Sequence, residues 1–197
     1  YRSSRGLGDV YKRQVLSWAA IGCAPETTPA QWDFDSSIRA LTVAPNGDVW
    51  WAGSAGLVGH HVDGVWAIDT LRSPKGDTPA FRSVAVTDEA AFVLSIESPE
   101  LLYRKLHTED TWSVVYTNTD SLAFFDSMHF WDNREGIAIG DPLGACLCVI
   151  VTRDGGETWS AVSCEDLPPA EEAAFAASNG NIALRGDEVW IATGGVA

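Results

Sequence analysis

The chain has 197 residues, enough to bury a sizeable core, and 46% of them are hydrophobic. Its formal net charge of −14 repels phosphate backbones, so nucleic acid is excluded as an expected partner. Nine tryptophans and 18 glycines favour short strands and tight turns over helices, which predicts an all-β protein.

The first 36 residues are not expected to belong to the fold. Residues 1–14 show no hydrophobic periodicity and resemble translated sequencing-adapter read-through, so they are interpreted as an artefact. Residues 15–36 combine an apolar run with a Pro/Thr-rich linker, and the run ends in Ala20-Ile21-Gly22-Cys23. This ending resembles the lipobox of bacterial lipoprotein signals, although leucine usually stands at the place of Ala20.

The resemblance to a lipobox predicts a truncated signal and lipidation at Cys23. The protein would then be extracytoplasmic, either periplasmic or at the outer membrane or cell surface, and would touch a membrane only through its lipid. In the alternative interpretation Cys23 is an ordinary cysteine that follows an apolar stretch.

An internal repeat fills residues 37–197. Four segments align as a strand, a turn and a second strand, and a further strand follows the last of them, at 38–53, 81–95, 125–140, 173–184 and 188–192. The strands show period-two alternation and the connections contain Asn, Asp, Gly and Pro, which is the pattern of sheets and tight turns.

Two independent sets of residues mark the length of the repeat. The members of one set are 43 and 44 residues apart: Arg39, Arg82 and Asp126. The members of the other are 46 and 47 residues apart: Trp66, Trp112 and Trp159. A period near 45 with several short strands per unit indicates a β-propeller blade. The sequence therefore predicts an incomplete propeller with about three and a half four-stranded blades.

A complete Asp-box of the form Ser/Thr-x-Asp-x-Gly-x-x-Trp is present as Thr152, Asp154, Gly156 and Trp159. An Asp side chain can accept backbone N–H groups inside a tight turn, and Gly supplies the positive φ there. We expect Trp159 to start the outer strand and to pack its indole between blades. Residues 62–66 and 109–112 look like degenerate copies. Because the motif is a structural device, it says little about activity.

With these motifs in view, the chain resembles Asp-box (BNR-repeat) β-propellers related to the photosystem II stability and assembly factor. The likeness is greatest to a branch common in Bacteroidetes whose members carry the names oxidoreductase or glycosyl hydrolase. Residues 124–142, 152–159 and 167–178 carry the resemblance. It implies a seven-bladed parent and a non-catalytic scaffold that binds another protein or assists assembly.

No motif for nucleotide or calcium binding is present, so we expect no cofactor and no metal. His60, His61 and His129 lack a further ligand at metal spacing. The enzymatic alternative is a sialidase-like glycoside hydrolase that acts on glycans. Such an enzyme needs an arginine cluster, a Tyr nucleophile with an acidic partner, and an acid/base carboxylate. Arg39 and Arg82 match two of the arginines, but no Tyr/Glu pair can be assigned.

Arg39, Arg82 and Asp126 are the candidate binding residues. Each lies near the start of the innermost strand of its blade, so the three side chains are expected at the central channel or its rim. In the alternative interpretation they form ion pairs between blades, each worth about 0–1 kcal/mol when exposed.

Three cysteines, at 146, 148 and 164, flank the Asp-box turn. The turn brings together residues whose numbers sum to about 311, so Cys164 faces either Cys148 or Cys146. Cys148 is nearer the turn, where a hairpin splays least, and we predict a Cys148–Cys164 disulfide with Cys146–Cys164 as the alternative. One of the three must remain a free thiol or pair outside this segment.

Overall fold

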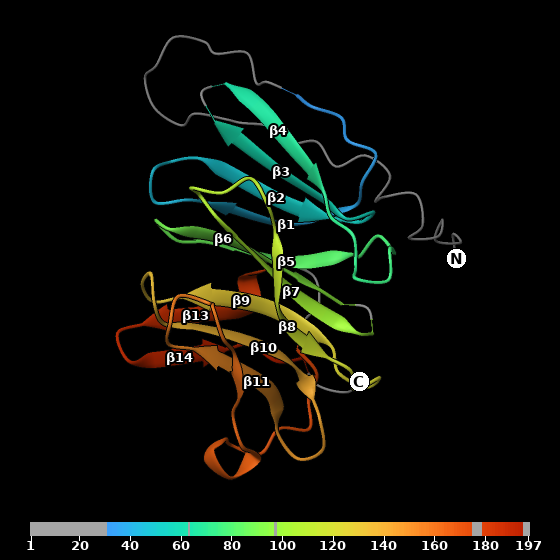
Figure 1. Cartoon of the computed structure of the whole chain (residues 1–197). Coiled ribbons are helices and arrows are strands. Elements are labelled where there is room, and N and C mark those ends of the chain that lie inside the picture. Colours follow the sequence, from blue (N-terminus) through green and yellow to red (C-terminus); the bar gives the residue numbers. More distant parts are fainter. Residues whose placement is uncertain (1–30, 63, 97, 175–178, 195–197) are drawn as a thin grey trace, which may run out of the picture.

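The computed structural model describes residues 31–62, 64–96, 98–174 and 179–194, so the predicted artefact, the signal and Cys23 lie outside the described residues. Antiparallel strands form successive sheets that stack on one another (Figure 1). In each of the first three sheets, four strands follow one another in chain order, as in the blade of a propeller. The predicted partial β-propeller is confirmed.

The first sheet contains β1 (Ile38–Val43), β2 (Val49–Gly53), β3 (Leu57–Val62) and β4 (Val65–Thr70). The second contains β5 (Phe81–Val86), β6 (Ala90–Ser95), β7 (Glu100–Leu106) and β8 (Ser113–Asn118). The third contains β9 (Phe125–Phe130), β10 (Gly136–Pro142), β11 (Leu147–Thr152) and β12 (Ser160–Ala161). A hairpin of β13 (Ile182–Arg185) and β14 (Glu188–Ile191) follows.

Short polar turns set the strand ends where the sequence predicted them. Between β1 and β2, the side chain of Asn46 accepts the backbone N–H of Asp48 at 3.0 Å, and Gly47 has a φ of 92°. Between β9 and β10, Asp132 accepts the backbone N–H groups of Arg134 and Glu135, both at 2.7 Å. These side chains pair with backbone N–H groups inside each turn. The first strand of each hairpin therefore ends before the turn, and the second begins after it.

Apolar side chains fill the space between neighbouring sheets. The cluster between the first two sheets includes Trp50, Val58, Phe81, Val93 and Tyr103. The next, between the second and third sheets, includes Phe92, Leu102, Phe125, Met128 and Trp159. A third joins the third sheet to the last hairpin through Ile137, Ile139, Val149 and Ile182. Because the second sheet is covered on both faces, β6 is buried along its whole length.

The fourth repeat departs from its predicted form. A first strand was expected at 173–177, but Ala174 makes an isolated bridge with Thr193, and residues 175–178 lie outside the described residues. The short helix η3 (Asn179–Asn181) occupies the predicted turn and leads directly into β13. β13 then lies beside β9, as β5 lies beside β1 and β9 beside β5.

The globular part begins earlier than the predicted boundary at residue 37. Trp32 and Phe34, assigned to the linker, pack on the first sheet. The ring centroids of Phe34 and Trp51 are 4.6 Å apart, and those of Trp32 and Trp66 are 5.4 Å apart. Aromatic pairs at these separations are stabilising, so the end of the linker covers a sheet face that would otherwise expose two indoles.

Candidate functional site

Three equivalent β-bulges place the candidate residues in the innermost strands. The pairing of β1 with β2 shifts between Ile38 and Ala40, so Arg39 is the extra residue of a bulge. The same irregularity falls at Arg82 in β5 and at Asp126 in β9. A bulge changes the direction of a side chain and bends its strand. The repeat therefore delivers Arg, Arg and Asp to the same point of three neighbouring strands.

Arg82, in the middle one of the three strands, interacts electrostatically with both Arg39 and Asp126. Burial lowers the pKa of the Arg82 guanidinium, the nearby charge of Arg39 lowers it further, and Asp126 raises it. The guanidinium also lies over the ring of Phe124, 5.8 Å from its centroid, which is within the range of a cation–π contact. Arg82 is thus coupled electrostatically to both of the other predicted residues.

Asp126 is fully buried, although it carries an ionisable group. Within the described part of the chain, neither of its carboxylate oxygens has a hydrogen-bond partner. Burial raises the pKa of Asp126 to about 7, Asp141 and Glu100 push it the same way, and Arg82 opposes them. Since a buried unpaired carboxylate is costly, the protein environment favours the protonated form of this side chain.

Glu100 is a member of the site that the sequence analysis missed. It is fully buried at the start of β7, and its Oε1 accepts the backbone N–H of Phe125 at 2.7 Å. Burial raises the pKa of Glu100 to about 7, against the effect of that hydrogen bond. A single acidic residue at the head of the apolar run Leu101-Leu102-Tyr103 was the available signal.

Asn179 connects the second and third sheets across their innermost strands. It accepts a hydrogen bond from the Ser83 hydroxyl at 2.6 Å and donates its amide to the carbonyl of Val84. The backbone carbonyl of Asn179 accepts a hydrogen bond from Nε2 of His129 at 2.8 Å. The predicted turn of the fourth repeat therefore fixes the relative position of β5 and β9, which carry Arg82 and Asp126.

The Asp-box folds as the motif predicts. Asp154 accepts the hydroxyl of Thr152 at 2.8 Å, the hydroxyl of Thr158 at 2.6 Å and the backbone N–H of Thr158 at 3.0 Å. The two bonds from Thr158 are the main reason that the pKa of Asp154 falls to about 2. Gly156 has a φ of 76° and donates its N–H to Thr152, so the turn is closed by its own residues.

The Asp-box also joins two sheets. A Cβ atom added at Gly156 would lie 2.2 Å from the ring of Phe92 in the second sheet. Trp159 is 8% exposed and meets Phe130 edge-on, with centroids 5.8 Å apart. The predicted position of Trp159 between blades is confirmed. At the equivalent place in the second sheet, Trp112 donates its indole N–H to Asp69 of the first sheet at 2.8 Å.

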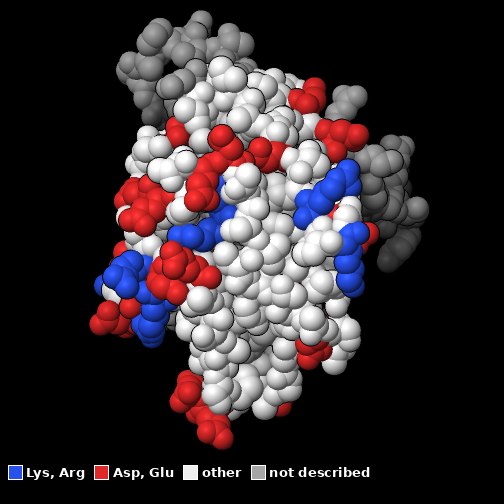
Figure 2. Space-filling model, in the orientation of Figure 1, with Lys and Arg blue, Asp and Glu red and all other residues white. Residues whose placement is uncertain are grey.

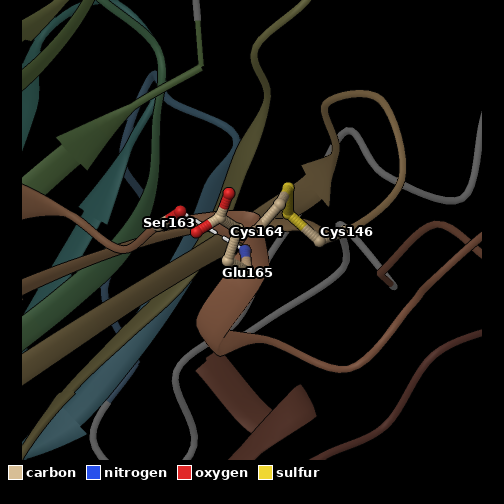
Figure 3. The surroundings of a disulfide bond; sticks show 4 residues. All are labelled: Cys146, Ser163, Cys164 and Glu165. Carbon is tan, nitrogen blue, oxygen red and sulfur yellow. Dashed lines mark hydrogen bonds between the residues drawn. A yellow bond between two sulfur atoms is a disulfide. The ribbon is translucent and has the colours of Figure 1, made fainter.

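The predicted Cys148–Cys164 disulfide is wrong. The bond joins Cys146 to Cys164, with Cα atoms 5.6 Å apart, and links the loop before β11 to the short helix η2 (Cys164–Asp166) (Figure 3). The register of β11 and β12 sums to 311 as expected. However, β12 ends at Ala161, and the chain then passes into η2, which carries Cys164 beyond the start of β11. A bridge that closes a loop of this length stabilises a fold by about 3 kcal/mol.

Cys148 is the free cysteine among the described residues. It packs against the cluster between the second and third sheets. Burial raises the pKa of its thiol to about 11, with further contributions from Glu100 and Asp120. At neutral pH the group is therefore a protonated thiol and a poor nucleophile.

No group of three or more His, Cys, Asp or Glu side chains is arranged to hold a metal ion in the described part of the chain. Nor does any helix there have the length and apolar character needed to cross a membrane.

Comparison with known proteins identifies the fold. No family model matches the chain, and no curated protein matches it. A structure of YCF48 bound to D1 peptide is similar at 16% identity and a TM-score of 0.51, over 64% of this chain and 40% of that one. YCF48 from Cyanidioschyzon merolae is similar at 16% identity and a TM-score of 0.50, over 72% of this chain and 39% of that one. U3-55K is similar at 13% identity and a TM-score of 0.52, over 66% of this chain and 40% of that one.

YCF48 is a β-propeller, and at these identities the likeness establishes the propeller fold of this chain. The chain spans about two-fifths of the length of each of the three proteins.

Proposed function

We propose that this protein is a non-catalytic β-propeller scaffold that binds a protein partner through the face that carries Arg39 and Arg82, with the buried Asp126 at the equivalent position of the third sheet. The observation that carries the proposal is the recurrence of one β-bulge at these three residues in neighbouring innermost strands. The innermost strands of a propeller surround its central channel, where several blades can contribute to one site. The peptide-bound YCF48 structure shows that a similar propeller binds a peptide.

The charge of this face favours an anionic group on the partner. Arg39 and Arg82 supply two half-buried guanidinium groups, and the pKa values of about 7 at Asp126 and Glu100 reduce the negative charge close to Arg82. The net charge of −14 works against an anionic ligand at long range. At 0.15 M salt the screening length is about 8 Å, so acidic residues farther away than this act only weakly on a ligand held by the two arginines.

Binding of a fluorescein-labelled hexaglutamate peptide tests the proposal, with hexaserine as the uncharged control. We expect Arg39→Gln and Arg82→Gln each to weaken hexaglutamate binding about tenfold at 0.15 M salt, since each removes a charge-assisted hydrogen-bond donor. Arg134→Gln is the matched control, because Arg134 is exposed in the β9–β10 turn and has the same charge. Equal weakening by Arg134→Gln, or equal binding of hexaserine, would reject this face as the site.

The cell-envelope location rests on the sequence of the N-terminal region and is part of the proposal. If Cys23 is lipidated, the intact precursor should incorporate labelled fatty acid in a bacterial host. The Cys23→Ser variant should then incorporate none, and equal labelling of both proteins would remove the anchor from the proposal.

Glycoside hydrolysis is the weaker alternative. Its missing element is a tyrosine activated by an acidic neighbour. Tyr116 does interact with Glu100, but burial raises the pKa of the Tyr116 hydroxyl and the charge of Glu100 raises it further. This effect disfavours the phenolate, so the described pair is poorly suited to nucleophilic attack.

A further inference from the structure

A pocket with polar and apolar walls lies between the first and second sheets, away from the face proposed above. It has a volume of about 330 Å³, within the range of small-ligand sites. The β1–β2 and β5–β6 turns and the ends of β3 and β7 surround it, and its polar lining includes Asp48, His60, Thr87, Asp88 and His107. In the orientation of Figure 1 these turns lie at the left, where acidic side chains are prominent on the surface (Figure 2).

Both imidazoles can present a hydrogen-bond acceptor to this pocket. Nε2 of His107 lies 3.0 Å from the carbonyl oxygen of Thr87, and since a carbonyl only accepts, Nε2 carries the proton. In the same way Nε2 of His60 faces the Asp48 carboxylate at 3.4 Å. Nδ1 of an imidazole that carries its single proton on Nε2 is an acceptor. Burial lowers the pKa of His60, although Asp48 opposes that effect, and this favours the neutral ring.

The Asp48 carboxylate and the backbone of Asp88 are each held by hydrogen bonds. Asp48 accepts the side-chain amide of Asn46 at 2.8 Å, and its backbone N–H returns a bond to the same residue. The backbone N–H of Asp88 donates to the side chain of Asn133 in the third sheet at 3.1 Å. Asp48 and Asp88 therefore lie in two anchored turns, one from each of the sheets that border the pocket.

No lysine or arginine is among the described residues that line the pocket. The nearby Lys105 is committed elsewhere, because its ammonium pairs with Asp69 at 3.1 Å and lies 5.9 Å from the ring of Trp112. Trp50 fixes one wall, with its indole stacked on the His60 ring at 3.7 Å and an interplanar angle of 18°. The lining of the pocket thus combines Asp48 and Asp88, two imidazoles and the indole of Trp50.

We propose that this pocket binds an organic cation, a guanidinium or alkylammonium group such as the side chain of an arginine or lysine on a protein partner. Such a group supplies several N–H donors and a positive charge, which the lining accepts and balances. Its alkyl stem can pack along the apolar part of the wall. Neither Arg39 nor Arg82 lines the pocket, so this proposal can be tested independently of the function proposed above.

The test uses the peptide acetyl-Gly-Arg-Gly-amide, with the citrulline peptide as a neutral control of the same shape. Binding is followed by NMR through the indole N–H of Trp50 and the ring signals of His60 and His107. We expect the arginine peptide to shift these signals in a saturable way and the citrulline peptide to leave them unchanged. Butylguanidinium serves as the free cation: equal affinity assigns recognition to the cationic group alone, and weaker affinity assigns it to a peptide-borne side chain.

Charge-neutral variants locate the site. Asp48→Asn and Asp88→Asn should each weaken binding of the arginine peptide about fivefold, the effect expected for a charge pair about 4 Å apart in water. Asp88 is exposed, so its replacement leaves the fold intact even if Asp48→Asn disturbs its turn. Asp187→Asn, in the exposed β13–β14 turn, removes the same charge and should have no effect. Arg82→Gln should likewise leave this binding unchanged.

Three results would overturn the proposal. The first is equal binding of the arginine and citrulline peptides. The second is equal weakening by Asp187→Asn, which would mean that the peptide responds only to net charge. The third is saturable binding of Zn²⁺ in the absence of any binding of the arginine peptide or of butylguanidinium, which would assign the two imidazoles to a metal.

Discussion

Replacing Trp159 with alanine is expected to lower the free energy of unfolding by about 3–5 kcal/mol. The side chain is 8% exposed and belongs to the cluster that joins the second and third sheets. Alanine would leave a cavity between two sheets that cannot collapse, because the disulfide, the Asp-box turn and Asn179 hold the surrounding chain. Urea denaturation followed by circular dichroism measures the change.

Trp190 provides the matched control for this substitution. It is 62% exposed on β14, so Trp190→Ala should change the unfolding free energy by less than about 0.5 kcal/mol. Gly156→Ala gives an independent test of the same interface, because its Cβ would meet Phe92 and its φ of 76° is strained for alanine. Similar losses in Trp159→Ala and Trp190→Ala would contradict the packing described.

Stability should fall as pH rises from about 4 to about 7, owing to Glu100 and Asp126. Folding raises the pKa of Glu100 from 4.5 to about 7 and that of Asp126 from 3.8 to about 7. Between these values the folded state keeps protons that the unfolded chain has released. Each group then lowers the unfolding free energy by about 1.4 kcal/mol per pH unit, which gives about 3 kcal/mol for Glu100 and about 4 kcal/mol for Asp126 over the whole range. The stabilisation is complete below pH 4 and lost above pH 7.

The variant Asp126→Asn separates this effect from general acid or base sensitivity. An amide does not titrate, so the variant should match the wild type near pH 4 and exceed its unfolding free energy by about 4 kcal/mol at pH 8. Asp187→Asn, at an exposed turn, should follow the wild-type profile. The prediction fails if Asp126→Asn shows the same fall in stability between pH 4 and pH 7 as the wild type.

The parts of the fold that depend on local sequence could be predicted. The strands of the first three repeats follow from turns whose residues bond to their own backbone, such as those around Asn46 and Asp132. The Asp-box was equally predictable, because Thr152, Asp154 and Gly156 satisfy one another within a few residues.

The parts that depend on packing between repeats could not be predicted. The spacing placed Arg39, Arg82 and Asp126 at one phase, but only the register of the sheets shows that each lies in a bulge. Glu100 looks like an ordinary surface acid until the third sheet covers it. Cys164 was paired with the wrong partner, because the short helix that ends β12 depends on how the chain leaves the sheet.

The pKa of Asp126, measured by carbon NMR of its carboxyl group in the wild type and in Arg82→Gln, tests the central claim most directly. If the bulges bring Arg82 and Asp126 together at a buried face, the wild-type pKa is about 7. It should rise further in Arg82→Gln, because Arg82 favours the charged form. A pKa near the ordinary value of 3.8 in both proteins would contradict the site described here.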